Sequence, residues 1–319
     1  KYRIENIKAC QYDKKDLPID PYVLGVLIGD GSISNRQISF TTYDEDLANK
    51  VFEKLGKDYI QGYCAYKDGI KIKYNIIYNH RFDKTKNNNY INSKYGCNPL
   101  IRELDKLDLM GKTSHTKFIP DIYKYSSVDD RISLLQGLMD TDGYINSKGG
   151  DIHYTTVSKQ LANDIYILTT ELGLNSRIHS LTNEYGIFYR VRISGNININ
   201  IFSIFRKSLR LGIRNTKTKR SSFKNKRRII DIIDLGYKEE CSCIMVDNPN
   251  HLYITDGYTV THNSNCHAAK SLNFLWFENK KTIKWFASDE AYLDNVNGTW
   301  KMLDAYRNHI NKHTDWIRM

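Results

Sequence analysis

The sequence lacks the long hydrophobic runs of a membrane protein, since no apolar stretch approaches the roughly 18 residues that a membrane span needs. It also lacks the charged and then apolar leader of a signal peptide. Its six cysteines stand at irregular positions (10, 64, 97, 241, 243 and 266), which does not suggest a disulfide framework and favours a reducing compartment. These absences predict a cytoplasmic protein.

Basic residues outnumber acidic ones, and this excess constrains the partners. The chain has 47 Lys and Arg against 36 Asp and Glu, a formal net charge of +11 and an isoelectric point near 9.1. Such a surface attracts polyanions, of which nucleic acid is the commonest inside a cell. At 319 residues, with 40% hydrophobic and 12% aromatic residues, the chain is long enough for two domains with packed cores.

The chain contains an internal repeat, which emerges when the sequence is compared with itself. The stretch VLGVLIGDGSI at 23–33 resembles LQGLMDTDGYI at 135–145. Both are apolar with helical spacing, share a glycine and contain Asp-Gly, so that Asp30 corresponds to Asp142. We expect each stretch to be a helix that ends near its acid.

Two further blocks recur in the same order. The segment ISFTTYDEDLANKVFEKLG from residue 38 resembles IHYTTVSKQLANDIYILTTELG from residue 152. The segment LDLMGKTSHTK from residue 107 aligns without gaps on LRLGIRNTKTK from residue 209, which pairs Lys117 with Lys219. Three blocks in one order indicate two copies of one structural unit, about residues 18–125 and 126–225.

Alternating strand-like runs lie between the second and third blocks of each copy, namely IKIKYNIIY at 70–78 and IFYRVRISG at 187–195. Each repeat is therefore predicted to have the order αββαββα, which makes the fold class α+β. Two such units would lie around a pseudo-two-fold axis. This symmetry suits a ligand that is itself approximately two-fold symmetric, such as duplex DNA.

The two acidic helices have the small residues that close packing on a repeat of themselves requires. Gly25 and Gly29 share a helix face, and Gly137 corresponds to Gly25. If the helices run side by side, their C-terminal ends bring Asp30 and Asp142 together at the axis. We expect the glycine after each acid to leave the helix with a positive φ.

Two carboxylates held close together repel each other unless a cation lies between them, so this arrangement predicts a divalent metal site. A metal ion bound by acidic oxygens beside a phosphodiester activates water and stabilises the leaving oxygen. Lys117 and Lys219, at the ends of the third block, are suited to polarise the water network or to neutralise charge on phosphate. The predicted chemistry is phosphodiester hydrolysis.

These features resemble the LAGLIDADG homing endonucleases, especially those inside inteins, over residues 18–225. The resemblance implies two repeats that form a saddle, and a monomer that makes double-strand breaks in duplex DNA at the intein-less host allele. In this family the last acid of each motif binds Mg²⁺, which carries over to Asp30 and Asp142. Asp140 corresponds to a non-catalytic acidic position, and Ile28 replaces its partner.

The family also has a lysine before an Ile-Pro pair ahead of the second motif, and KFIP at 117–120 fits with Lys117 as the candidate. Lys219 follows from the internal symmetry alone, and Lys217 lies close by on the same basic stretch. A single apolar helix ending in Asp-Gly is usually a capped core helix, and a single lysine is usually solvated. Two copies with matching flanks favour the functional interpretation.

Basic residues on the strand-like runs are candidate DNA contacts on a sheet that lies in the major groove. The alternative is that they are ordinary surface charges. The candidates are Lys71, Lys73, Arg190 and Arg192.

The composition changes after the basic stretch KNKRRII, and residues 226–263 are predicted to form a small β element of Hint type. Their end resembles the C-terminal junction of an intein. There Asn263 would cyclise and cleave the following peptide bond, His262 would protonate the leaving amine, and Ser264 would accept the upstream host segment as an ester. Thr261 precedes this histidine, and His251 could assist from the preceding strand.

Cys243 stands where many inteins have Asp, which together with Thr261 resembles the inteins in which an internal cysteine makes the first attack. Alternatively Cys243 is a buried residue of a β core. A zinc site with Cys241 is the third interpretation, and no second ligand pair supports it.

The remaining segments are interpreted from this framework. Residues 1–17 are predicted to be a linker from N-terminal splicing blocks that this chain does not include, so that splicing would need an upstream N-terminal intein fragment as partner. Residues 264–319 are predicted to be an α/β C-extein fragment, with a helix over SNCHAAKSLNFLWFENKK and a strand at TIKWFAS. A P-loop NTPase such as a phage terminase or a helicase would fit as the host protein, in a phage- or prokaryote-like host.

Two alternatives to an active nuclease remain open. One is a degenerate member that binds DNA without cutting it, as a maturase-like or repressor module. The other is a purely splicing element with a decayed insert.

Overall fold

The computed structural model describes residues 3–33, 37–67, 70–79, 98–195, 197–218, 226–229, 246, 252–255, 258–262, 274–278 and 282–286. The chain forms two compact units. We call Lys8–Asn225 the main unit, and Lys1–Ile7 together with Lys226–Met319 the terminal unit.

The main unit contains the same succession of elements twice. The first repeat consists of α1 (Pro21–Gly29), β2 (Gly31–Ser32), β3 (Ser39–Thr41), α2 (Glu45–Leu55), β4 (Tyr59–Lys67), β5 (Ile70–Tyr78) and α3 (Pro99–Lys106). The short helix α4 (Asp121–Lys124) precedes the second repeat. That repeat consists of α5 (Val128–Thr141), β6 (Gly143–Ile145), β7 (Ile152–Thr156), α6 (Lys159–Glu171), β8 (Asn175–Asn183), β9 (Gly186–Ser194) and α7 (Phe205–Thr218). The predicted order αββαββα and the α+β class are therefore found in both halves.

Each repeat builds one four-stranded antiparallel sheet with the same connectivity. The strand orders are β2-β3-β5-β4 and β6-β7-β9-β8. Phe40 lies opposite Tyr74 in the first sheet, and its counterpart Tyr154 lies opposite Val191 in the second. All four side chains are buried, so each sheet turns one apolar face towards the core.

Both central helices have clear start points. The Asp20 side chain accepts hydrogen bonds from the backbone N–H groups of Tyr22 and Val23, and a proline occupies the first turn of α1. Ser127 caps α5 by accepting from the N–H of Asp130. Every residue of α1 from Tyr22 to Ile28 is buried, as expected of a helix that is apolar on all sides.

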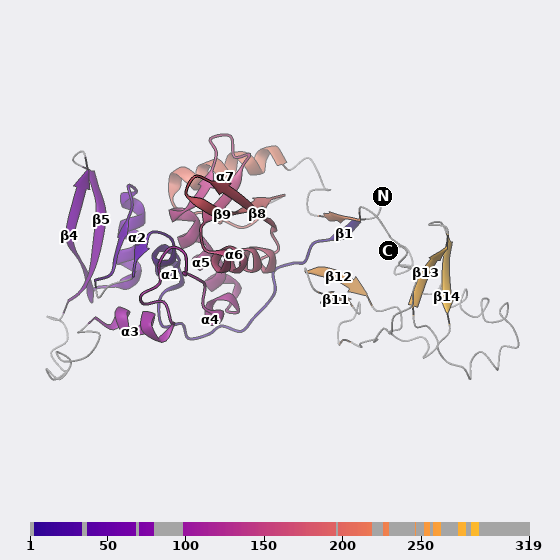
Figure 1. The fold of residues 1–319 in the computed structure, drawn as a ribbon, viewed down its shortest axis with the longest axis horizontal. Helices are drawn as coiled ribbons and strands as arrows, with labels where there is room; N and C mark the ends of the chain where they lie inside the picture. The colour runs from indigo at the N-terminus through magenta and orange to yellow at the C-terminus, as the bar shows by residue number, and fades with distance from the viewer. Residues whose placement is uncertain are drawn as a thin grey trace, which may run out of the picture. The chain divides into compact units, whose positions relative to one another are not determined.

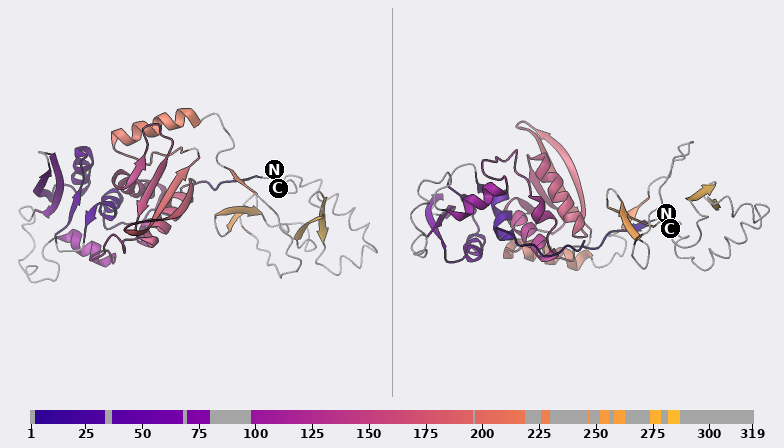
Figure 2. Two further views of the ribbon diagram at one scale, coloured as in Figure 1. Left: turned by 45° about the horizontal axis from the view of Figure 1, so that its top comes forward. Right: turned by 90° about the horizontal axis from the view of Figure 1, so that it is seen from below.

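The contact between α1 and α5 joins the two repeats at the centre of the main unit, as Figures 1 and 2 show. The backbones touch through glycine, because a Cβ on Gly25 would lie 2.4 Å from the carbonyl oxygen of Leu134 and a Cβ on Gly137 would lie 2.2 Å from that of Tyr22. Gly29 faces Thr141 in the same interface. The predicted role of Gly25, Gly29 and Gly137 in close packing is thus found in the structure.

The glycines after the acids serve a different purpose from the predicted one. Neither Gly31 nor Gly143 is among the residues with positive φ. A Cβ there would instead lie 2.3 Å from a backbone oxygen of the preceding helix, that of Leu27 in the first repeat and of Met139 in the second. The prediction of positive φ was wrong because the chain turns back tightly against its own helix without entering the left-handed region.

A fully buried arginine holds the start of the main unit on the second repeat. Arg131 donates from Nε to the Ser126 oxygen at 3.0 Å, and its guanidinium also bonds the Cys10 carbonyl and lies 3.8 Å from Glu171. The Cys10 N–H donates to the Glu171 carbonyl at 2.8 Å. Part of the predicted linker over residues 1–17 is therefore packed on α5 and α6.

The terminal unit consists, in its described parts, of three two-stranded antiparallel sheets. They pair β1 (Arg3–Glu5) with β10 (Lys226–Arg228), β11 (Leu252–Thr255) with β12 (Thr259–His262), and β13 (Phe274–Glu278) with β14 (Thr282–Phe286). The first pair joins the segments that precede and follow the main unit. Among the described residues no helix combines the length and apolarity required to cross a membrane.

One secondary-structure prediction in this unit was wrong. The segment Phe274–Glu278, predicted as helix, is strand β13, and the predicted strand at TIKWFAS is β14. Leu275 lies opposite Trp285 in this hairpin. Aromatic residues favour the extended pairing over a short isolated helix.

Candidate active site

Asp30 and Asp142 occupy equivalent positions, as the C-cap residues of α1 and α5. Both are exposed to solvent. Desolvation by the surrounding groups and, to a smaller extent, the negative charge of Asp142 raise the pKa of Asp30 to about 6, against the opposing charges of Lys117 and Lys207. Asp142 is therefore close enough for its charge to act on Asp30.

The second acid has a hydrogen-bond partner that has no equivalent at the first acid among the described residues. Partial burial raises the pKa of Asp142, and a hydrogen bond from the Tyr154 hydroxyl at 3.3 Å works against this rise. Tyr154 is fully buried in β7. Its counterpart in the first repeat is Phe40, which has no hydroxyl, so the acid pair is asymmetric.

Lys117 is buried beneath Asp30. It lies outside helix α1 in the sequence and binds the carbonyl groups at the C-terminal end of that helix. Its Nζ donates to the carbonyl oxygens of Leu27 at 3.1 Å, Gly29 at 3.0 Å and Gly31 at 2.7 Å. These oxygens belong to the end of the helix, where the carbonyls have no partner within the helix and the dipole is negative. Burial lowers the pKa of Lys117 to about 8, against the opposing charges of Asp142 and Asp30.

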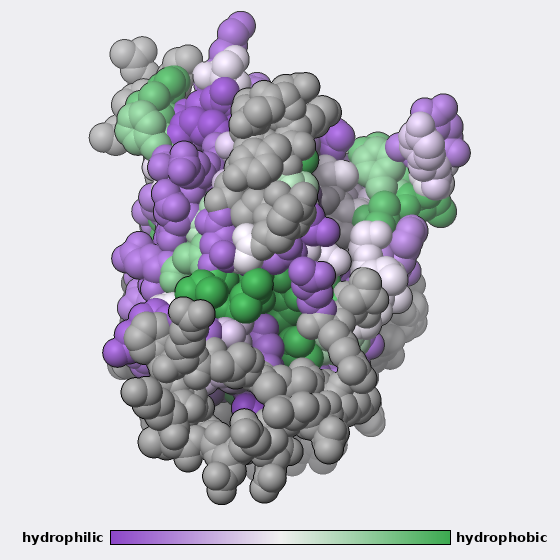
Figure 3. Space-filling model, turned by 90° about the vertical axis from the view of Figure 1, so that its left-hand side faces the viewer, coloured by the Kyte–Doolittle hydropathy of each residue, from purple (hydrophilic) through white to green (hydrophobic). Residues whose placement is uncertain are grey.

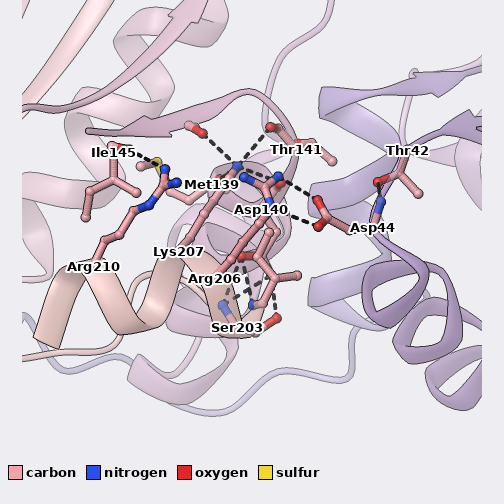
Figure 4. A network of polar contacts seen from close by, with 12 residues as sticks. Thr42, Asp44, Met139, Asp140, Thr141, Ile145, Ser203, Arg206, Lys207 and Arg210 are labelled. Carbon is pink, nitrogen blue, oxygen red and sulfur yellow. Dashed lines mark hydrogen bonds and ion pairs between the residues drawn. The ribbon is translucent and has the colours of Figure 1, made fainter. Parts of the chain in front are cut away.

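Lys207 makes the equivalent contacts in the second repeat (Figure 4). From the first turn of α7 its Nζ donates to the carbonyls of Met139 at 2.8 Å, Asp140 at 2.7 Å, Thr141 at 3.2 Å and Gly143 at 2.7 Å. Burial lowers its pKa to about 8. The structure thus assigns to Lys207 the position that the sequence alignment gave to Lys219, which lies outside the described residues.

The contacts of these lysines define what they can do. An ammonium has three protons, and each lysine has at least three carbonyl acceptors within hydrogen-bond distance. Both groups therefore fix the helix ends that present the acids, and place positive charge beside the carboxylates.

Asp140, in the last turn of α5, is a structural acid that binds the segment just before α7. It accepts hydrogen bonds from the N–H of Ser203 at 2.9 Å, the N–H of Ile204 at 3.3 Å and the Tyr22 hydroxyl at 3.0 Å. Because this carboxylate is buried and already accepts these hydrogen bonds, it does not form part of a solvent-facing site. Its counterpart Ile28 is buried in the core.

The candidate DNA contacts lie on the sheet faces that point away from the core. Lys73 is exposed on β5, and Arg190 and Arg192 alternate with the buried Val191 on β9. Arg177, which was not predicted, lies opposite Arg192 on the same face. The side chain of Lys71 lies outside the described residues.

Two features distinguish the arginines of this face. The Arg192 guanidinium lies 3.2 Å from Asp151, and the Nε of Arg190 is buried with no hydrogen-bond partner in the described part of the chain.

On the other repeat, Figure 3 shows the end where β4 and β5 lie, with hydrophilic groups around an apolar centre. Ile60 and Ile77 are exposed on these strands.

The predicted splicing residues are only partly described. Thr261 and His262 lie in β12, opposite Tyr253 and Leu252 of β11. The other predicted residues lie outside the described part, namely Cys243, His251, Asn263 and Ser264.

The acid pair fits a divalent cation of the Mg²⁺ type. Within the described residues there is no group of three or more His, Cys, Asp or Glu side chains that could form a closed metal site. Mg²⁺ usually keeps several waters and binds through one or two carboxylates together with substrate phosphates. Two exposed carboxylates, as at Asp30 and Asp142, match that requirement.

Comparison with known proteins identifies part of the main unit. Residues 129–203 match the sequence profile of the LAGLIDADG-like domain. The second repeat is therefore similar to a LAGLIDADG-like domain. The LAGLIDADG-like segment spans most of the second repeat and includes Asp142 and Tyr154. No curated protein matches the chain.

Solved structures of the homing endonuclease I-DmoI are similar to the chain at low identity. A set of mesophilic I-DmoI variants is 13% identical, covering 62% of this chain and 96% of that one, with a TM-score of 0.37. An I-DmoI variant with its target DNA and Mn is 14% identical, with coverages of 66% and 97% and a TM-score of 0.37. I-DmoI with DNA and Ca is 15% identical, with coverages of 56% and 83% and a TM-score of 0.34. These TM-scores are too low to support an assignment.

Proposed function

We propose that the main unit is a site-specific DNA endonuclease that uses Mg²⁺ to make double-strand breaks. The observation that carries this proposal is the placement of Asp30 and Asp142 at the ends of two helices whose backbones touch through glycine. The raised pKa of each acid supports it, because a carboxylate pair that resists ionisation gains most from a shared cation. The matched LAGLIDADG-like domain agrees with it.

In this proposal the acids, the lysines and the arginines of the chain have different roles. Asp30 and Asp142 would hold the Mg²⁺, which when bound activates water and stabilises the leaving oxygen. Lys117 and Lys207 keep the helix ends rigid and supply positive charge under the acids. The arginines of the second sheet would bind the DNA backbone or base edges.

The test is a plasmid that carries the host gene without the intein-coding segment. We expect the full chain with Mg²⁺ to convert supercoiled plasmid to linear DNA, and the Asp30→Asn, Asp142→Asn double variant to leave it intact. Asp129→Asn, an exposed acid in the first turn of α5, is the matched control and should cut as the wild type does. Undiminished cutting by the double variant would exclude this site.

We further propose that residues 226–263 of the terminal unit are the C-terminal part of a splicing element into which the nuclease is inserted. The pairing of β1 with β10 supports this, because it joins the chain just before the main unit to the chain just after it. The predicted chemistry is cyclisation of Asn263 assisted by His262, with transfer of the host segment to Ser264. Mixing with a matching N-terminal fragment should yield ligated host product, and Asn263→Ala should abolish it.

A further inference from the structure

The residue before the second helix of each repeat occupies the same local structure. The N–H of Asp44 donates to Thr42 Oγ1 at 3.1 Å, and the N–H of Ser158 donates to Thr156 Oγ1 at 3.1 Å. Both residues are N-caps, of α2 and α6 respectively. Their side chains are therefore held in equivalent places by equivalent turns.

Each of these side chains contacts the lysine segment of the other repeat. Ser158 Oγ donates to the backbone oxygen of Lys117 at 2.8 Å. Farther along α6, the buried Asp164 accepts from the N–H of Ile119 at 2.9 Å. The lysine that caps α1 of the first repeat is thus fixed by the second repeat.

The reciprocal contact is an ion pair (Figure 4). Asp44 accepts from Arg206 Nε at 2.8 Å and from Nη2 at 2.6 Å, a two-pronged geometry that restrains the position of the guanidinium. Arg206 immediately precedes Lys207 at the start of α7. The Asp44 side chain makes no capping hydrogen bond to its own helix, so this interhelix contact is its main interaction.

We propose that Asp44 and Ser158 are positioning residues, each of which holds the lysine segment of the opposite repeat beside the acid pair. Each lysine cap is then complete only when the two repeats are docked. The guanidinium of Arg206 holds the pKa of Asp44 below its usual value, so the pair stays charged over the neutral range. A role of this arrangement in catalysis rests on the proposed nuclease function, whereas the positioning of the two lysine segments does not.

The inference is tested by measuring how fast each buried lysine of the full chain is acetylated by dilute acetic anhydride. Lys117 and Lys207 are only 6% and 5% exposed, so both should react slowly in the wild type. Asp44→Asn should speed acetylation of Lys207 about fivefold or more, equivalent to about 1 kcal/mol of easier local opening, and leave Lys117 within about twofold. Ser158→Ala should give the opposite pattern.

Two further variants separate positioning from general loosening. Arg206→Gln should reproduce the Asp44→Asn pattern, and the exchange Asp44→Arg with Arg206→Asp should restore slow acetylation of Lys207. Asp46→Asn, an exposed acid of the same helix turn, is the matched control. Equal changes at both lysines in both variants, or none at either, would overturn the inference. Absence of DNA cleavage by the wild type would remove the nuclease proposal and leave this result standing.

Discussion

At the scale of single residues, the site is an acid pair whose ionisation is opposed by its own surroundings. Burial and the charge of Asp142 raise the pKa of Asp30 to about 6. A raised acid pKa means that the folded protein binds this proton more tightly than the unfolded chain does. Above pH 6 the ionised pair therefore destabilises the folded protein, and a bound cation would reduce this destabilisation.

This ionisation predicts a pH-dependent cation affinity. Below pH 6 a proton on Asp30 must leave before the cation binds, so Mg²⁺ affinity should fall by up to about tenfold per pH unit and should level off above pH 7. Calorimetric titration of the full chain between pH 5 and 8 measures it, with proton release in buffers of different ionisation enthalpy as the check. Asp129→Asn should follow the wild-type curve. An affinity that is flat from pH 5 to 7 would contradict the assignment of the cation to this pair.

The sequence predicted the acids and missed two of their neighbours. Asp30 and Asp142 were identifiable because they lie inside continuous, aligned motifs. Lys207 was not, because the chain between acid and lysine is shorter in the second repeat and the ungapped alignment paired Lys117 with another residue. Tyr154 could have been noticed as the tyrosine that replaces Phe40, although its contact with Asp142 depends on the sheet register.

At the scale of the elements, the contact between α1 and α5 decides whether the acids meet. This contact predicts that Gly25→Ala destabilises the main unit by about 1–3 kcal/mol, because the new methyl group forces the helices apart. The matched control is Gly212→Ala in α7, where an added Cβ meets nothing within 4 Å. It should stabilise by up to about 1 kcal/mol through helix propensity. Urea unfolding measures both, and a Gly25→Ala protein as stable as the wild type would show that the helices are not in backbone contact.

The buried Arg131 gives a second prediction for the packing of α5 on α6. Arg131→Leu should cost about 3–5 kcal/mol, because it leaves the Glu171 carboxylate buried without its cation. Arg131→Leu with Glu171→Leu should recover much of that loss. The exposed Arg177→Leu on β8 should change the free energy of unfolding by no more than about 0.5 kcal/mol. A single variant no less stable than the double variant would contradict the role of this pair.

Element order was predictable, and local backbone geometry was less so. The repeat and the alternating runs predicted αββαββα because two periodicities are visible in the residues themselves. The turn after each acid depends instead on the distance from Gly31 and Gly143 to their own helices, which no periodicity encodes. The strand at Phe274–Glu278 also required knowledge of its pairing partner.

At the scale of the whole molecule, the excess positive charge and the basic sheet face predict salt-sensitive DNA binding. Affinity for a nonspecific duplex should fall steeply with salt, and Arg190→Gln with Arg192→Gln should reduce the slope of log affinity against log salt by about one for each phosphate that the variant no longer neutralises. Lys106→Gln, an exposed residue of α3 that is paired with Glu103, is the control. Fluorescence anisotropy over a salt series measures the slopes. An unchanged slope in the double variant would exclude this face as the DNA surface.

The sequence predicts a boundary near residue 226, where the composition changes. The structure divides the chain between Asn225 and Lys226, and also assigns Lys1–Ile7 to the terminal unit. That second assignment depends on the pairing of Ile4 with Arg227, far apart in the sequence. Such long-range pairing between short strands has no local signature.

The central claim is that the acids of the two repeats lie together and share a cation, and thermal unfolding at pH 7.5 with and without Mn²⁺ tests it most directly. Without the cation, Asp30→Asn and Asp142→Asn should each raise the Tm of the main unit by about 2–4 °C, because either change removes the repulsion. Their combination should add little to either single change. Mn²⁺ should raise the Tm of the wild type and of neither variant. Equal Tm values in all four proteins, with equal shifts on adding Mn²⁺, would contradict the claim.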